Sequence, residues 1–224
     1  MSGGVSAVDP GMLADPATFR ALVMVPGQPM LLPGAARSWP LLAGGAPAIL
    51  DTLRRFDAGR EAEIFIGQPE IDARYYYDPS LAGFNFTRES VTFAEGLRRI
   101  AETAGRPGRE TIYMGSLPSE RYLPGIEELA HLPFLPASVR PRFWIGHESR
   151  VACHYDTMDN VACVAAGRRR FTLYPPQAIA DLYAGPIDHT MAGQPVALAV
   201  DSEPGDPRFP RFESIRDSAL VVDL

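Results

Sequence analysis

The central segment of this chain reads Val151-Ala152-Cys153-His154-Tyr155-Asp156, and one hairpin later it reads Gly167-Arg168-Arg169-Arg170-Phe171. Side chains two positions apart in a β-strand point to the same face, so His154 and Asp156 can meet at one point. An imidazole and a carboxylate placed in this way are two of the three ligands of the 2-His-1-carboxylate site that binds non-haem Fe(II). The segment therefore predicts a strand that carries a metal site.

The chain around this segment has the pattern of an antiparallel β-protein. Short runs of apolar and β-branched residues between turn residues favour a sandwich or barrel. The strands expected there are 111–114, 142–146, 150–155, 161–166 and 170–174. Before them, apolar periodicity and capping residues predict helices at 15–25, 46–56 and 90–104, and strands at 29–33, 63–66 and 74–77.

The fold class predicted from this order is mainly β with flanking helices. The 22 prolines and 20 glycines are spread along the chain, which argues against a linker between two domains. We expect one structural domain, in which an N-terminal α/β part, residues 1–110, packs on a barrel built from residues 111–224. The tyrosines at 75–77 and Trp144 are expected to serve as core and rim packing.

Composition excludes several classes of function. The chain has 224 residues, 46% of them hydrophobic, and a net charge of -6, so nucleic acid is not an expected partner. No apolar stretch approaches the length of a membrane span, and Met1–Gly11 lacks the features of a signal peptide, so we expect a cytoplasmic protein without a membrane partner. All 21 basic residues are arginine, which excludes lysine-dependent chemistry. Cys153 and Cys163 are expected to be buried apolar residues.

The motifs together resemble one known family. A His154-x-Asp156 strand, an asparagine four residues further on, and the Gly167–Pro176 strand resemble the JmjC-type, cupin-like Fe(II)/2-oxoglutarate oxygenases, in particular their bacterial branch. The resemblance extends upstream through Tyr113-Met114-Gly115-Ser116 and Trp144-Ile145-Gly146, and so covers nearly the whole chain.

This resemblance implies a double-stranded β-helix, also called a jelly roll, that uses Fe(II), 2-oxoglutarate and O₂ to hydroxylate a protein or small-molecule substrate. Carried over by position, His154 and Asp156 would bind the iron. Tyr113 and Asn160 would line the co-substrate pocket, and Arg169 would bind the distal carboxylate of 2-oxoglutarate. Arginine suits this last role because its guanidinium can bind a carboxylate through two parallel N–H bonds.

The sequence departs from the family pattern in two places. Val151 stands where many relatives have a threonine hydroxyl, so one contact to the co-substrate is lost. The family's second iron-binding histidine follows a later Gly-Asp turn, and this sequence reaches Leu224 where that turn would begin. We therefore expect a β-helix that is incomplete at its C-terminus, a fragment of a longer reading frame, and an open sheet edge that could form a homodimer.

Three hypotheses follow. The first is an Fe(II)/2-oxoglutarate hydroxylase of unknown substrate. The second is a cupin-like binding or regulatory protein that keeps the fold and the pocket without the chemistry. The third is a cupin that uses another divalent metal. Of the remaining histidines, His147 and His189 are expected to have surface or capping roles and not to bind metal, and His131 is expected to be a loop residue.

Overall fold

The structure is a computed structural model that describes residues 5–191 and 193–224. The strands are β1 Ser6–Ala7, β2 Met30–Leu31, β3 Glu61–Gly67, β4 Arg74–Tyr75, β5 Thr87–Thr92, β6 Thr111–Pro118, β7 Arg142–Gly146, β8 Arg150–Val151, β9 Arg170–Leu173 and β10 Leu220–Asp223. The α-helices are α1 Pro16–Phe19, α2 Gly45–Phe56, α3 Phe93–Thr103 and α4 Ser119–Tyr122, and a π-helical turn at Arg20–Met24 continues α1. Short 3-10 turns lie at Pro10–Met12, Pro40–Leu42, Pro69–Ile71, Ile126–Glu128, Pro176–Asp181, Phe212–Ser214 and Arg216–Ser218.

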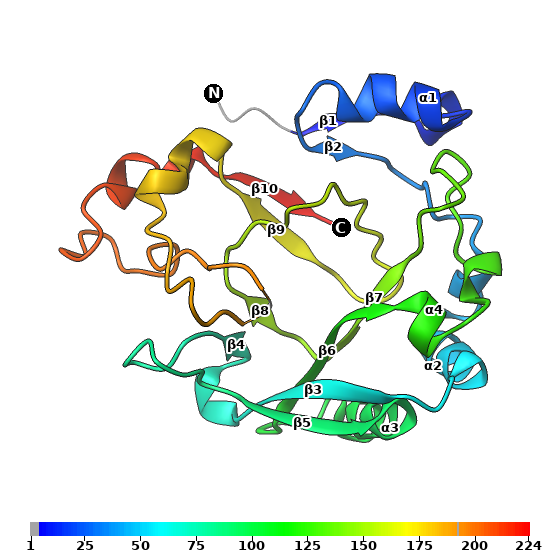
Figure 1. The fold of residues 1–224 in the computed structure, drawn as a ribbon, viewed down its shortest axis with the longest axis horizontal. Helices are drawn as coiled ribbons and strands as arrows, with labels where there is room; N and C mark the ends of the chain where they lie inside the picture. The colour runs from blue at the N-terminus through cyan, green and yellow to red at the C-terminus, as the bar shows by residue number, and fades with distance from the viewer. Residues whose placement is uncertain (1–4, 192) are drawn as a thin grey trace.

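A four-stranded antiparallel sheet in the order β5-β3-β6-β7 forms the centre of the fold. The other strands form three two-stranded pairs, of which β1-β2 and β4-β8 are parallel and β9-β10 is antiparallel. Figure 1 shows the β9-β10 pair across the molecule from β3 and β5. The result is mainly sheet with flanking helices, an arrangement consistent with a jelly roll.

Helices α2 and α3 cover one face of the central sheet. The buried side chains Phe93 and Leu97 of α3 pack in one cluster with Ile64 of β3 and Met114 of β6, and each of the four is 0% exposed. Burying a side chain of this size contributes about 1.5–3 kcal/mol, so this face holds much of the stability of the fold. Thr92 caps α3, because its hydroxyl accepts a hydrogen bond from the backbone N–H of Glu95 at 3.2 Å.

The opposite face of the sheet carries polar and aromatic side chains. One row crosses the four strands through the paired residues Arg88, Phe65, Tyr113 and Gly146, in the order β5, β3, β6, β7. We call this row, Arg88-Phe65-Tyr113-Gly146, the inner row. The Arg88 guanidinium lies 5.1 Å from the Phe65 ring centre, and the Phe65 and Tyr113 rings stack at 6.1 Å. This face, and not the helix-covered one, is therefore available for a binding site.

Several predicted elements have their predicted positions. The helix expected at 46–56 is α2, the strand at 142–146 is β7, and the strands at 63–66 and 170–174 correspond to β3 and β9. The expected packing of the tyrosine run is confirmed for Tyr75 and Tyr77, which are 5% and 3% exposed.

Other predictions are wrong in detail. Ser90–Thr92 is the end of strand β5 and not the start of a helix, because these residues pair with Glu61–Glu63 of β3. The strand expected at 150–155 shortens to Arg150–Val151, and residues 161–166 are not a strand. In the described part of the chain, residues 154–168 make no backbone hydrogen bond to other backbone groups, so no neighbouring strand completes a ladder there.

Trp144 is also not the expected core anchor. On β7 its neighbours Phe143 and Ile145 pack against the helix-covered core, and strand alternation therefore places Trp144 on the opposite face, where it is 51% exposed.

The central sheet contains strands from both sides of residue 110, so the expected division into residues 1–110 and 111–224 runs through one sheet. That division stays a prediction.

Across residues 5–191 and 193–224, no helix has the length and apolar character needed to cross a membrane.

Candidate metal and co-substrate site

His154 and Asp156 follow directly after β8, and the structure brings them together. The Nε2 atom of His154 lies 3.9 Å from Oδ1 of Asp156. Two metal–ligand bonds of about 2.1 Å each can span at most about 4.2 Å, so both atoms can bind one ion. Both side chains are partly exposed, at 32% and 58%, and thus open to a ligand from solution.

The backbone fixes which ring nitrogen of His154 is free. Its Nδ1 atom lies 2.8 Å from the carbonyl oxygen of Ala152, and since a carbonyl oxygen can only accept, Nδ1 carries the proton and donates it. Nε2 is then the ring nitrogen left for a metal, and it faces Asp156. Metal-binding histidines have this kind of partner on the second nitrogen, which holds the ring in one orientation.

The donor set fits Fe(II) in part. A neutral imidazole nitrogen and a carboxylate are two members of the 2-His-1-carboxylate set. Among the described residues, no group of three histidine, cysteine, aspartate or glutamate side chains could hold a metal ion. The described residues thus offer two protein ligands for a metal.

Tyr113 lies on β6 in the inner row and is half-buried. Burial raises the pKa of its hydroxyl to about 12, with the Arg169 guanidinium lowering the pKa and Tyr75 and Asp156 raising it. Both Arg169 and Asp156 therefore lie close enough to act on this hydroxyl. Although these three residues are far apart in the sequence, the fold gathers them on one side of the central sheet.

Arg169 adjoins β9, and its backbone extends the ladder of that strand. Its N–H donates to Leu224 at 3.0 Å, and its carbonyl accepts from Leu224 at 2.8 Å. The guanidinium lies 5.0 Å from the ring of Phe171, two residues on, so both side chains share one face. Arg170 points away and pairs with Asp223 at 2.7 Å on the surface. Arg169 is exposed, as Arg168 and Arg170 are, so its role at the co-substrate carboxylate stays a prediction.

Asn160 is not joined to the other candidates. It is exposed after a bend at residues 157–158, and no hydrogen bond of its side chain occurs within the described residues. Its role in a co-substrate pocket stays a prediction.

The other histidines have structural contacts. His147 is half-buried: its Nδ1 accepts from the N–H of Ile112 at 2.9 Å, and its Nε2 lies 2.9 Å from the carbonyl oxygen of Ile100. It therefore joins α3 to β6 and is not a surface residue. His189 contacts the side chain of Asp188 and the carbonyl oxygen of Leu81. Both of these partner residues are exposed.

Reasoning from the sequence missed the rest of the inner row. Arg88, Phe65 and Gly146 were not assigned to the site, although alternation along β3 and β7 puts Phe65 and Gly146 on the face opposite the apolar core. Gly146 is needed there because a Cβ at this position would lie 2.7 Å from the backbone oxygen of Ile112 and 3.0 Å from Cα of Tyr113. The close approach of β7 to β6 at Tyr113 requires glycine.

A mainly β fold with a histidine–carboxylate pair on its open side is consistent with a cupin-like domain. Comparison with known families agrees: residues 16–224 match the model of the cupin-like domain. This chain belongs to the cupin-like domain family.

One curated relative is the lysine-specific demethylase JMJ31 of Arabidopsis thaliana. It is 44% identical to this chain over 46 residues, which is 20% of this chain and 8% of that protein. The match therefore spans a small part of the relative.

Proposed function

We propose that this protein is an Fe(II)- and 2-oxoglutarate-dependent oxygenase that hydroxylates a protein or small-molecule substrate. The observation that carries the proposal is the pair His154 and Asp156, 3.9 Å apart, with the second nitrogen of His154 held by Ala152. Membership in the cupin-like family supports the same assignment. The name of the plant relative suggests oxidation of an N-methyl group on lysine as one candidate reaction for this chain.

The chemistry supplied by bound Fe(II) is activation of O₂, with one oxygen atom entering the substrate C–H bond and the other entering succinate as 2-oxoglutarate loses CO₂. The residues of this chain bind and orient the reactants. His154 and Asp156 hold the metal. Arg169 binds the distal carboxylate of 2-oxoglutarate through paired N–H donors. Tyr113, whose raised pKa keeps its hydroxyl protonated, donates a hydrogen bond to the same carboxylate.

The experiment is succinate release from 2-oxoglutarate by the purified protein, with and without Fe(II). We expect release only with Fe(II), and we expect Arg169→Gln to raise the KM for 2-oxoglutarate at least tenfold, since a charge-assisted hydrogen bond is worth about 1.5–3 kcal/mol. Arg168→Gln is the matched control, because Arg168 is the neighbouring exposed arginine. Equal KM values for the two variants would refute the role of Arg169.

The second candidate is a cupin-like binding or regulatory protein without turnover. The specific observation in its favour is that the described residues supply no third side chain for a metal cluster. It predicts that 2-oxoglutarate binds with equal affinity in the presence and absence of metal, and that no succinate forms. A third possibility, another divalent ion, would be seen as Zn or Mn in a metal analysis of the isolated protein.

For partners, we propose a homodimer and no nucleic acid. The net charge of -6 offers no general attraction to phosphate backbones. Val221 of strand β10 is 58% exposed, and a sheet edge of this kind can pair with a second copy of the chain. A cytoplasmic location stays part of the proposal.

A further inference from the structure

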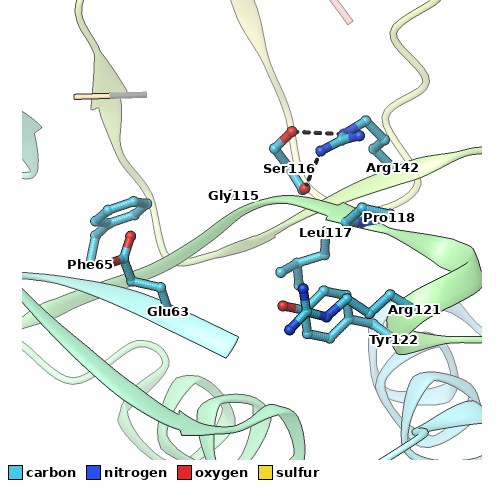
Figure 2. Close-up of a pocket in the computed structure, with 9 residues that line it drawn as sticks. All are labelled: Glu63, Phe65, Gly115, Ser116, Leu117, Pro118, Arg121, Tyr122 and Arg142. Atoms are coloured by element: carbon cyan, nitrogen blue, oxygen red, sulfur yellow. Dashed lines mark hydrogen bonds between the residues drawn. The ribbon is translucent and has the colours of Figure 1, made fainter. Parts of the chain in front are cut away.

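A cavity of about 260 Å³ lies beside the inner row, at the end of the central sheet where β6 meets α4. Figure 2 shows the residues around it. Its walls include Glu63 and Phe65 of β3, Ser116 of β6, Arg121 and Tyr122 of α4, and Arg142 of β7. None of these residues belongs to the proposed metal or co-substrate set.

Two arginines in this cavity have no carboxylate partner within the part of the chain that the structure describes. Arg142 donates from Nε to the Ser116 hydroxyl at 2.8 Å and from Nη2 to the Ser116 carbonyl at 3.0 Å, and both acceptors are neutral. Arg121 lies over the Tyr122 ring at 5.5 Å. The one carboxylate in the wall, Glu63, has the Arg88 guanidinium at 3.6 Å. The cavity thus has an excess of positive charge.

The backbone is shaped to hold Arg142 in place. The pairing of β6 with β7 shifts register between Met114 and Leu117, which is a β-bulge. Within it Ser116 has a φ of 56°, in the left-handed region that a residue with a side chain rarely adopts. The bulge turns both oxygens of Ser116 toward Arg142, as Figure 2 shows. Strain of this kind is concentrated at active sites and ligand-binding sites.

The cavity also adjoins the candidate site. Phe65 lines the cavity, and its ring stacks on the ring of Tyr113 at 6.1 Å. The charges of Arg169 and Asp156 act in turn on the hydroxyl of Tyr113. A molecule that occupies the cavity would therefore lie next to the inner row at Phe65. A second cavity, also of about 260 Å³, differs: its Arg150 is paired with Asp72 at 3.0 Å, and Glu148 lines it.

We propose that this cavity binds an anionic group of the substrate, a carboxylate or a phosphate, through Arg121 and Arg142. The anion is distinct from 2-oxoglutarate, which is assigned to Arg169. A guanidinium binds either oxyanion through two N–H donors, and Phe65 and Tyr122 supply an aromatic wall for the body of the ligand. As a statement about the substrate, this inference rests on the proposed oxygenase function.

The test measures binding of two probes, benzoate and phenyl phosphate, by ligand-observed NMR, with benzyl alcohol as the neutral counterpart. The purified full chain is used without iron. We expect at least one anion to bind at least tenfold more tightly than benzyl alcohol, and Arg142→Gln or Arg121→Gln to remove that tenfold advantage. Arg168→Gln, in an exposed arginine outside the cavity, should change the affinity less than twofold. A preference between the two probes identifies carboxylate or phosphate as the recognised group.

Two results would overturn the inference. One is binding of both anions no tighter than that of benzyl alcohol. The other is loss of anion binding in Arg169→Gln but not in the two cavity variants, which would place the anion at the co-substrate carboxylate. Circular dichroism of each variant checks its folding. Since the readout needs neither iron nor turnover, a failure of succinate release would count against the proposed function and leave this result intact.

Discussion

Four influences act on the hydroxyl of Tyr113. Burial raises its pKa to about 12, Arg169 opposes this change, and Tyr75 and Asp156 add to it. The hydroxyl therefore stays protonated, and remains a hydrogen-bond donor, over the whole pH range in which most proteins are stable. An acid group of 2-oxoglutarate held by Arg169 would meet a neutral donor at Tyr113, and not a competing negative charge.

The prediction for this residue uses Tyr113→Phe, which removes only the hydroxyl. We expect the Kd for 2-oxoglutarate to rise by up to tenfold, because a neutral hydrogen bond contributes about 0.5–1.5 kcal/mol. Isothermal titration in the presence of Mn(II) measures this change. Tyr155→Phe is the control, since Tyr155 is 52% exposed and is not one of the proposed ligands. An affinity in Tyr113→Phe equal to that of the control would exclude contact between the hydroxyl and the co-substrate.

At the scale of elements, local patterns predicted helices and strands best where one face is buried. Helix α2 and strand β7 lie where their apolar periodicity indicates, because that periodicity is what packs into the core. Ser90–Thr92 was misassigned since its exposed residues have no apolar alternation, and its strand state comes from pairing with β3. An apolar pattern in the sequence indicates which face of an element is buried, but it does not indicate which strand pairs with that element.

The same reasoning explains the site. Two-residue alternation predicted that His154 and Asp156 converge, and they do, although no strand ladder forms at that position. Tyr113 and Arg169 came from the family resemblance and not from local pattern. No local signal links positions 56 residues apart; tertiary packing alone brings Arg169 and Asp156 close enough to act on Tyr113.

The contact between α3 and the central sheet predicts a pH dependence. Burial lowers the pKa of His147 below its usual 6.5, with a weaker rise from the Ile100 hydrogen bond and a decrease from Arg109. The unfolded chain therefore binds a proton at a pH where the folded chain does not. The free energy of unfolding should fall as the pH decreases below about 6.5 toward the pKa of the folded state.

We test this with His147→Gln and urea unfolding at pH 7.5 and 5.5. The substitution should cost about 1–3 kcal/mol at pH 7.5, because it disturbs two buried hydrogen bonds. It should also reduce the stability difference between the two pH values. His131→Gln, at an exposed histidine, should leave that difference unchanged. The account of His147 fails if both variants keep the same pH dependence as the unsubstituted protein.

The pairing of β6 and β7 depends on Gly146. A methyl group there would meet backbone atoms of Ile112 and Tyr113, which cannot move without breaking the ladder. We expect Gly146→Ala to lower the free energy of unfolding by about 1–3 kcal/mol and to weaken 2-oxoglutarate binding through displacement of Tyr113. Glu148→Ala, in the exposed turn that follows, is the control. Urea unfolding measures the stability, and unchanged stability in Gly146→Ala would contradict the close approach.

At the scale of the whole molecule, the two faces of the central sheet have different roles. Helices α2 and α3 bury the apolar face, and the opposite face carries the inner row. The segment after β8 brings the candidate ligands to that open face, and β9 brings Arg169. The proposed oxygenase chemistry depends on this gathering of distant segments.

The most direct test of this account is the affinity of the protein for a divalent metal, measured with Mn(II) by electron paramagnetic resonance. If His154 and Asp156 both bind the same ion, His154→Ala and Asp156→Ala should each weaken Mn(II) binding at least tenfold. His131→Ala and Asp159→Ala, at exposed residues outside the pair, should bind like the unsubstituted protein. Mn(II) affinity that is the same in all four variants would contradict a metal site at His154 and Asp156.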